Sequence, residues 1–202
     1  MMKKREQSLQ TKEKLLGAAQ VIFAKSGFDS ASVASICEAA GVSKGAFYHH
    51  FESKQALFFE LMKRWLDDLE ERLHEIEARE ADVPEKLFSM AHVVGDVLQM
   101  GGPQLSIYLE FWNQAIRDRD VHRTLSQPFD DFIAFFSGLL EDGMERGTIK
   151  SGDAEMTARV IIALGIGLLF QGLLEPGAAD WNEATAFGLN LLFEGLYRGD
   201  KS

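Results

Sequence analysis

The sequence predicts an all-α protein of about nine helices. Apolar residues recur with a helical spacing almost throughout the 202 residues, and no stretch alternates between apolar and polar residues as a strand would. Clusters of proline and glycine divide the chain into segments of helical length. Because 46% of the residues are hydrophobic, the chain can also bury an ordinary globular core.

Three short helical segments occupy the N-terminal part. The first has an apolar stripe made of Leu15, Leu16, Ala19, Ile22 and Phe23. It ends at Gly27, a residue suited to a helical C-terminus. A second helix follows Ser32, whose hydroxyl can cap it, and Gly41 supplies the left-handed conformation that a tight turn requires. Ser43 can cap a third helix, KGAFYHH.

The remaining helices are longer. A fourth helix is predicted from Ser53 to the residues before Pro84. Further breakers follow at Gly101-Gly102-Pro103, at Pro128, in ERGTIKSGDAE and at Pro176-Gly177. The helical candidates beyond Pro84 are about 84 to 100, 104 to 117, 122 to 146, 153 to 175 and 180 to 198.

Charge is distributed unevenly along the chain. The formal net charge is −10, which by itself argues against a nucleic-acid partner. Residues 1 to 65, however, hold 10 Lys and Arg against 6 Asp and Glu, a net charge of +4, whereas the remainder holds 11 against 25, a net charge of −14. A basic N-terminal segment therefore precedes an acidic body.

Two short helices joined through a glycine turn predict a helix-turn-helix, whose second helix presents its first residues to the major groove of DNA. Gly45 lowers the stability of a helix, so its presence needs a compensating reason such as the close approach of another molecule. A DNA duplex would be such a molecule. Lys44 can reach a base edge or a phosphate, and Tyr48 and His50 can bond phosphate oxygens. Lys54 adds charge beside the N-terminus of the fourth helix, which attracts anions.

The segment ASVASICEAAGVSKGAFYHHFESKQALF resembles the DNA-binding signature of the TetR family of transcriptional regulators. The matching positions are Gly27-Phe28, Ser32-Val33, Ile36, Ala40-Gly41-Val42-Ser43, Gly45, Tyr48, His50-Phe51 and Ser53-Lys54. The resemblance implies a DNA-binding domain over residues 1–52, followed by a domain over 53–202 that binds a ligand and dimerises through its last two helices. Ala31 and Cys37 depart from the family pattern, which often has threonine and alanine there.

The motif and the resemblance together select one set of candidate DNA-binding residues. These are Ser32, Ser43, Lys44, Gly45, Tyr48, His49, His50 and Lys54. The alternative is an ordinary three-helix core with solvated polar residues. We expect no metal here, because adjacent helical residues point about 100° apart and no Cys or acidic group completes a site. Cys37, the only cysteine, is expected to pack as a small hydrophobe, although a redox role stays open.

Aromatic residues recur at helical spacing in the middle of the chain. Such stripes are usually core, but they also suit an apolar pocket for a small molecule. The candidate ligand-binding residues are Phe88, His92, Tyr108, Phe111, Trp112, Phe132, Phe136, Phe170 and Gln171. The segment YLEFWNQAIRDRDVHRTL resembles the subgroup typified by the choline-responsive repressor, from which we carry over the architecture and no ligand.

The last two helices suggest a homodimer. ARVIIALGIGLLFQGLL is apolar nearly all round, and Gly165, Gly167 and Gly172 would permit close helix approach. Paired with their symmetry mates, the two helices would form a four-helix interface, unless they only close the core of one chain. The longest uncharged apolar run has about 15 residues and includes Gln171, so we expect a cytoplasmic protein with no membrane partner.

The function expected from these features is a homodimeric repressor that binds a palindromic operator in double-stranded DNA and is released by a small-molecule inducer. We expect no cofactor and no enzymatic activity, because the chain lacks a Gly-rich phosphate loop, G-x-S-x-G and H-E-x-x-H. Two alternatives remain: a helical adaptor without specific DNA binding, and an activator of the same fold. The operator sequence, the regulated genes and the inducer cannot be read from the sequence.

Overall fold

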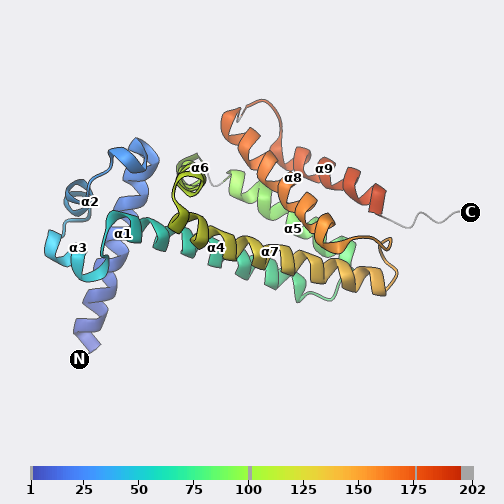
Figure 1. Ribbon diagram of the computed structural model, residues 1–202, viewed down its shortest axis with the longest axis horizontal. Helices are drawn as coiled ribbons and strands as arrows, with labels where there is room; N and C mark the ends of the chain where they lie inside the picture. The colour runs from blue at the N-terminus through green and yellow to red at the C-terminus, as the bar shows by residue number, and fades with distance from the viewer. Residues whose placement is uncertain (1, 100–101, 176, 197–202) are drawn as a thin grey trace, which may run out of the picture. The chain divides into compact units, whose positions relative to one another are not determined.

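The computed structural model describes residues 2–99, 102–175 and 177–196, and these contain nine α-helices and no strand. The helices are α1 (Met2–Ser30), α2 (Val33–Ala40), α3 (Lys44–His50), α4 (Lys54–Glu77), α5 (Val83–Gln99), α6 (Gly102–Arg117), α7 (Arg119–Glu145), α8 (Ala154–Leu174) and α9 (Trp181–Leu196) (Figure 1). The predicted all-α fold is confirmed.

The predicted helix boundaries hold where caps fix them and shift elsewhere. Gly27 interrupts the helical backbone inside α1 with φ 76° and ψ 166°. The fourth helix ends at Glu77, earlier than predicted. Asp82 accepts a hydrogen bond from the backbone N–H of Glu85 at 2.9 Å and so caps α5. Pro84 therefore lies in the first turn of α5, where a backbone N–H would have no acceptor within the helix, so proline loses no hydrogen bond there.

Pro128 lies inside α7 and does not end it. The helix begins at Arg119, a little before the predicted residue 122, and runs on to Glu145. A proline inside a helix removes one backbone hydrogen bond, but packing along the rest of a long helix can outweigh that loss. The packed face of α7 includes Ile133, Phe136, Leu139 and Leu140.

The helices form two compact units. Unit 1 contains Met1–Asp67 and Gly102–Asp118, and unit 2 contains Asp68–Gly101 and Arg119–Ser202. The packing thus groups α6 and the first half of α4 with the predicted DNA-binding segment. A single boundary in the sequence cannot describe these units, because each of them contains two separate segments of the chain. The division of the chain at residue 52 into a DNA-binding and a ligand-binding domain remains a prediction.

The core of unit 1 joins α1 to the three helices that follow it (Figure 1). Its buried side chains include Leu15, Leu16, Ala19, Phe23, Ala31, Ile36, Cys37, Phe47, Phe51, Leu57, Phe58 and Met62. Three aromatic rings close one end of this core: Phe28 lies 5.5 Å from Phe23 and 4.8 Å from Phe58, between ring centroids. Helix α6 packs along α1.

Ion pairs fasten α1 to α4 at the edge of the unit 1 core. Arg64 donates two hydrogen bonds to the carboxylate of Glu13, at 2.7 and 2.8 Å, and Lys12 pairs with Glu60. The hydrogen bond from Arg64 lowers the pKa of Glu13, and the hydrogen bond from Lys12 lowers the pKa of Glu60. Both carboxylates are therefore ionised at neutral pH, and the pairs link the two helices in that range.

Unit 2 is built from the second half of α4 with α5, α7, α8 and α9. Helix α8 packs against α7, α5 and α9, and α5 packs against α9. The buried cluster that results includes Leu73, Ile76, Val83, Leu87, Met90, Phe136, Leu139, Leu140, Ile149, Ala158, Ile161 and Leu189. Among the described helices, α8 alone is long and apolar enough to cross a membrane, a length and composition that core helices of soluble proteins also have.

Two glycines of α7 give a direct test of the packing in unit 2. A Cβ at Gly143 would lie 3.0 Å from Val83 Cγ1 and 3.1 Å from Ile149 Cδ1, whereas a Cβ at Gly138 would meet no atom within 4 Å. We expect Gly143→Ala to lower the free energy of unfolding by about 1 to 3 kcal/mol through overpacking. Gly138→Ala is the matched control and should raise it by up to about 1 kcal/mol. Urea denaturation measures both, and equal effects would contradict this packing.

Candidate nucleic-acid interface and ligand-binding residues

Capping side chains and one glycine fix the geometry of α2, the turn and α3. Ser32 Oγ accepts a hydrogen bond from the backbone N–H of Ser35 at 3.0 Å, and Ser35 Oγ accepts one from the backbone N–H of Ser32. Gly41 takes φ 65°, the left-handed conformation predicted for the turn. Ser43 Oγ then accepts from the N–H of Ala46 at 3.1 Å and starts α3. These contacts make the predicted helix-turn-helix.

Helix α3 has an inner and an outer face. Phe47 is completely buried and Phe51, just after the helix, is buried as well. Lys44, Gly45, Tyr48 and His49 are all exposed. At about 100° per residue, these four fall within one arc of the helix surface that lies away from Phe47. The burial of one phenylalanine thus orients four of the candidate DNA-binding residues outward together.

Gly45 has no internal neighbour that requires a glycine. A Cβ at this position would meet only Ser43 Oγ, at 3.7 Å, which is ordinary van der Waals contact. The backbone there is helical, so an alanine would also be unstrained. The fold of this chain therefore gives no reason for Gly45, whereas the close approach of another molecule would.

His50 lies to the side of this exposed face. It is half-buried, and its ring centroid lies 5.1 Å from that of His49. Burial lowers the pKa of His50, and the nearby His49 and Lys12 lower it further. His50 is therefore mainly neutral at pH 7 in the free protein and can accept as well as donate a hydrogen bond.

Three of the candidate DNA-binding residues have clear intramolecular roles. Ser32 and Ser43 are exposed helix caps, so their hydroxyl groups are shared between a backbone N–H and the solvent. Lys54 lies at the start of α4, where Ser53 Oγ accepts from the N–H of Ala56 at 3.0 Å. The Nζ atom of Lys54 donates to backbone carbonyls of unit 1, and no sequence pattern indicated these bonds.

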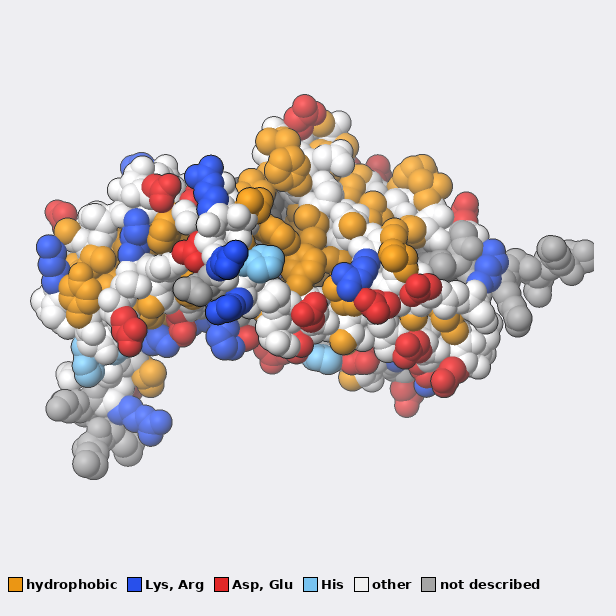
Figure 2. Space-filling model, in the orientation of Figure 1, with side chains coloured by type: hydrophobic (Ala, Val, Ile, Leu, Met, Phe, Trp, Pro, Cys, Tyr) orange, Lys and Arg blue, Asp and Glu red, His pale blue; other side chains and the backbone are white. Residues whose placement is uncertain are grey.

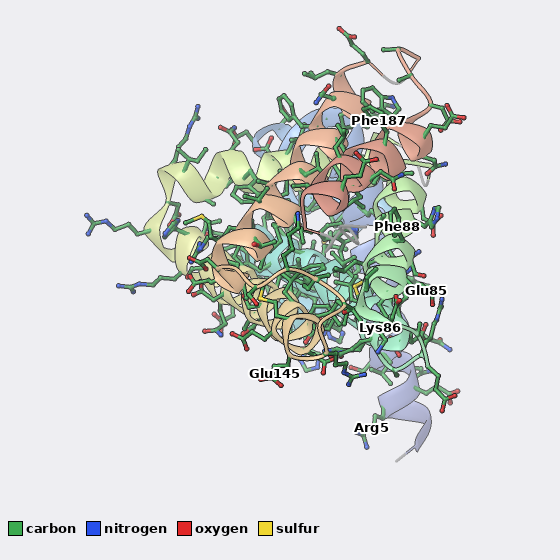
Figure 3. All side chains as sticks on the ribbon, turned by 90° about the vertical axis from the view of Figure 1, so that its right-hand side faces the viewer. Arg5, Glu85, Lys86, Phe88, Glu145 and Phe187 are labelled. Atoms are coloured by element: carbon green, nitrogen blue, oxygen red, sulfur yellow. The ribbon has the colours of Figure 1, made fainter. Side chains whose placement is uncertain are left out.

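The candidate ligand-binding residues of unit 2 differ in burial. Phe136 belongs to the buried cluster, and Phe88 on α5 (Figure 3) and Phe132 on α7 are half-buried against it. His92 on α5 and Gln171 on α8 are exposed in the single chain, and Phe170 is 47% exposed. The first three residues share the unit 2 core, whereas the last three lie on its surface.

Trp112 is the described member of the candidate set in unit 1, where it is half-buried on α6. The side chains of Tyr108 and Phe111 lie outside the described residues. Two polar atoms that the sequence did not single out are buried in unit 2: Ser137 Oγ and Trp181 Nε1 have no hydrogen-bond partner among the described residues. A buried polar atom of this kind is suited to a polar group of a ligand.

Neither Cys37 nor the two histidines of α3 indicates a redox or metal-binding role. Cys37 is 4% exposed in the core of unit 1, as expected for a packing residue. Within the part of the chain that the structure describes, no three or more His, Cys, Asp or Glu side chains come together as a possible metal site.

Taken together, the exposed face of α3 and the capped turn before it are features of a helix-turn-helix DNA-binding protein. Residues 15–61 match the family described as bacterial regulatory proteins, tetR family. Residues 85–192 match the BetI-type transcriptional repressor, C-terminal. The chain therefore belongs to the TetR family and is a DNA-binding transcriptional regulator rather than an enzyme.

Similar proteins agree with this assignment. The chain is 31% identical over 172 residues to the transcriptional regulator BetI of Pseudomonas paraeruginosa, covering 84% of this chain and 83% of BetI. It is 28% identical over 148 residues to the transcriptional repressor KstR2 of Rhodococcus jostii, covering 73% and 72%. A transcriptional regulator from Pseudomonas aeruginosa PAO1 has the same fold, with a TM-score of 0.81, 24% identity and coverage of 91% and 88%.

Gly45 gives a test in which stability and DNA binding separate. Gly45→Ala should raise the free energy of unfolding by up to about 1 kcal/mol, because the site is helical and open. The same variant should lose roughly tenfold or more in DNA affinity, since the methyl group prevents close approach to the duplex. Urea denaturation and fluorescence anisotropy with operator DNA measure the two effects.

Gly17→Ala is the matched control for this test. Gly17 is an exposed helical glycine of α1, and a Cβ there would meet no atom within 4 Å. The substitution should stabilise the protein and leave DNA affinity unchanged. If Gly45→Ala bound DNA as well as Gly17→Ala did, Gly45 would not lie at the interface.

Proposed function

We propose that this protein is a homodimeric repressor that reads a roughly palindromic operator with one copy of α3 in each of two successive major grooves, about 34 to 36 Å apart. The observation that carries the proposal is the exposed face of α3, with Lys44, Gly45, Tyr48 and His49 opposite the buried Phe47. Ser32, Ser43 and His50 flank this face as further candidate contacts. The match of the C-terminal region to BetI-type repressors favours repression over activation.

The dimer contact is proposed to involve α8 and α9. Along α8, Met156, Val160, Phe170 and Leu174 are 44% to 64% exposed and recur at helical spacing on one side. Gly167 falls on the same side, and a Cβ there would meet no atom within 4 Å, which leaves room for another helix. On α9, Phe187 and Leu191 are 66% and 57% exposed.

Apolar side chains exposed together along one side of α8 and on α9 need a partner that shields them from water. Figure 2 shows hydrophobic side chains at the surface of this part of the chain, and Figure 3 marks Phe187 on α9. A second copy of the chain is the partner that helix-turn-helix recognition of a palindrome requires. Phe170, a candidate ligand contact, fits this subunit contact better than a ligand site because it lies in the exposed stripe of α8.

The inducer is proposed to be a small apolar or amphipathic molecule. Support comes from the half-buried aromatic side chains Phe88 and Phe132 in unit 2. Ser137 and Trp181 add buried polar atoms that a polar ligand group could engage. Such a ligand releases the operator only if it binds the DNA-incompetent state more tightly than the DNA-bound state. The protein acts in the cytoplasm, where its DNA lies.

Fluorescence anisotropy of the purified protein tests the DNA-binding part of this proposal. The duplex from upstream of its own gene is compared with a scrambled duplex, each at about 50 and 200 mM salt. A sequence-specific regulator should prefer the native duplex by at least about 10³, with affinity that falls steeply as salt rises. Weak, salt-insensitive binding to both duplexes would instead favour a helical adaptor that does not act on DNA.

Sedimentation equilibrium tests the dimer. The natural chain should have twice the mass of one chain, and the double variant Phe170→Glu and Phe187→Glu should have the mass of one chain, because burying two carboxylates in an apolar contact is unfavourable. Ile116→Glu is the control, since Ile116 is 82% exposed but lies on α6 of unit 1, whereas α8 and α9 belong to unit 2. A double variant that remained dimeric, or a monomeric natural chain, would contradict this interface.

A further inference from the structure

The ammonium group of Lys54 is surrounded by backbone carbonyl oxygens. Its Nζ atom lies 2.6 Å from the carbonyl oxygen of Phe28, 2.8 Å from that of Ala31 and 3.5 Å from that of Asp29. The ring centroid of Phe28 lies 4.2 Å from the same atom, within range of a cation–π contact. A lysine ammonium has three hydrogens to donate, and these neighbours can use all of them.

The carbonyl oxygens belong to residues 28–31, which follow the break at Gly27 near the end of α1 and form the turn that leads into α2. Gly27 breaks the helical backbone of α1, so the carbonyl groups that follow it lack regular intrahelical partners. The N–H of Ala31 donates to the oxygen of Phe28 at 3.3 Å, a long bond that holds this turn only loosely. A basic side chain is a favourable donor to such carbonyl groups at the end of a helix.

The same turn sets the start of the helix-turn-helix. Ala31 is 5% exposed, and the next residue, Ser32, caps α2. Phe58 lies one turn after Lys54 on α4, and its ring packs on Phe28, so α4 contacts this turn twice. Helix α6 also reaches it, since Gln114 Nε2 lies 3.5 Å from Asp29 Oδ1. Residues 28–31 thus join α4 and α6 to the N-terminal cap of α2.

We infer that Lys54 is a positioning residue, which fastens the first turn of α4 to residues 28–31 and so sets the orientation of α2 and α3, and that it makes no contact with DNA phosphate. This inference rests on the proposed function, because it concerns how the α3 face is held for the operator. It replaces the expectation that Lys54 adds a phosphate contact. A shift of α4 would move the N-terminal cap of α2 through this fastening.

The test compares Lys54→Met with Lys44→Met, a control that removes the same charge from the exposed face of α3. Hydrogen exchange is first measured in the protein without DNA. Lys54→Met should speed exchange at the amides of residues 31 and 35–36 by about tenfold or more, because the turn opens locally. Lys44→Met should leave exchange at these amides unchanged, since Lys44 is exposed and lies outside the turn.

Operator affinity of each variant is then measured against salt. Lys54→Met should bind the operator roughly tenfold more weakly while keeping the salt slope of the natural chain. A lost phosphate contact would reduce the slope of log K against log salt by about 0.9 per protomer. Unchanged exchange together with a reduced slope would make Lys54 a phosphate ligand, and no change in either would leave it without a role; both outcomes overturn the inference.

Two further results are decisive. Lys54→Gln keeps an amide donor, so its exchange at residues 31 and 35–36 should be intermediate between the natural chain and Lys54→Met. If Lys54→Met does not fold, Lys54→Gln takes its place in the comparison. Global unfolding of both variants, seen by circular dichroism, would overturn the inference, because fastening one turn does not hold a whole core together. If the natural chain bound no duplex specifically, the proposed function would fail, while the exchange comparison would still decide whether Lys54 holds the turn.

Discussion

The burial of Phe47 is the constraint on which the DNA-binding part of this protein depends. Helix α3 has only seven residues, far fewer than an isolated helix needs to be stable in water. Burying one phenylalanine contributes about 1.5 to 3 kcal/mol, and that contribution is available in only one orientation of the helix. The exposure of Lys44, Gly45, Tyr48 and His49 is therefore a consequence of packing: the side chain that stabilises α3 also determines which residues face outward.

The sequence predicted the features that depend on local chemistry. Serine caps, the left-handed Gly41 and the apolar stripe of α1 determine helix ends and buried faces within a few residues, so the helix-turn-helix and its exposed face could be anticipated. Contacts between distant segments could not. Nothing in a lysine at the start of a helix indicates that its ammonium group meets the carbonyl of Phe28, because that depends on where the backbone turns after Gly27.

The C-terminal region was less predictable for a related reason. Aromatic residues at helical spacing look the same whether they fill a core, line a ligand site or meet a second subunit. The structure separates them by burial: Phe136 lies in the core of unit 2, whereas Phe170 lies at its surface in line with Val160 and Leu174. Helical spacing gives direction around one helix, but burial depends on which neighbouring helices cover that direction.

The two kinds of contact between α1 and α4 respond differently to the surroundings of the protein. The pairs of Arg64 with Glu13 and of Lys12 with Glu60 are partly exposed, so dissolved ions screen them. The aromatic contact between Phe23 and Phe58 is buried and is not weakened in this way. A cell that accumulates ions under osmotic stress would therefore loosen the N-terminal half of α1 from α4 while the aromatic end stayed closed. Ionic strength would then affect this regulator in two ways. It would weaken the internal ion pairs between α1 and α4 as well as the contacts with the phosphates of its operator.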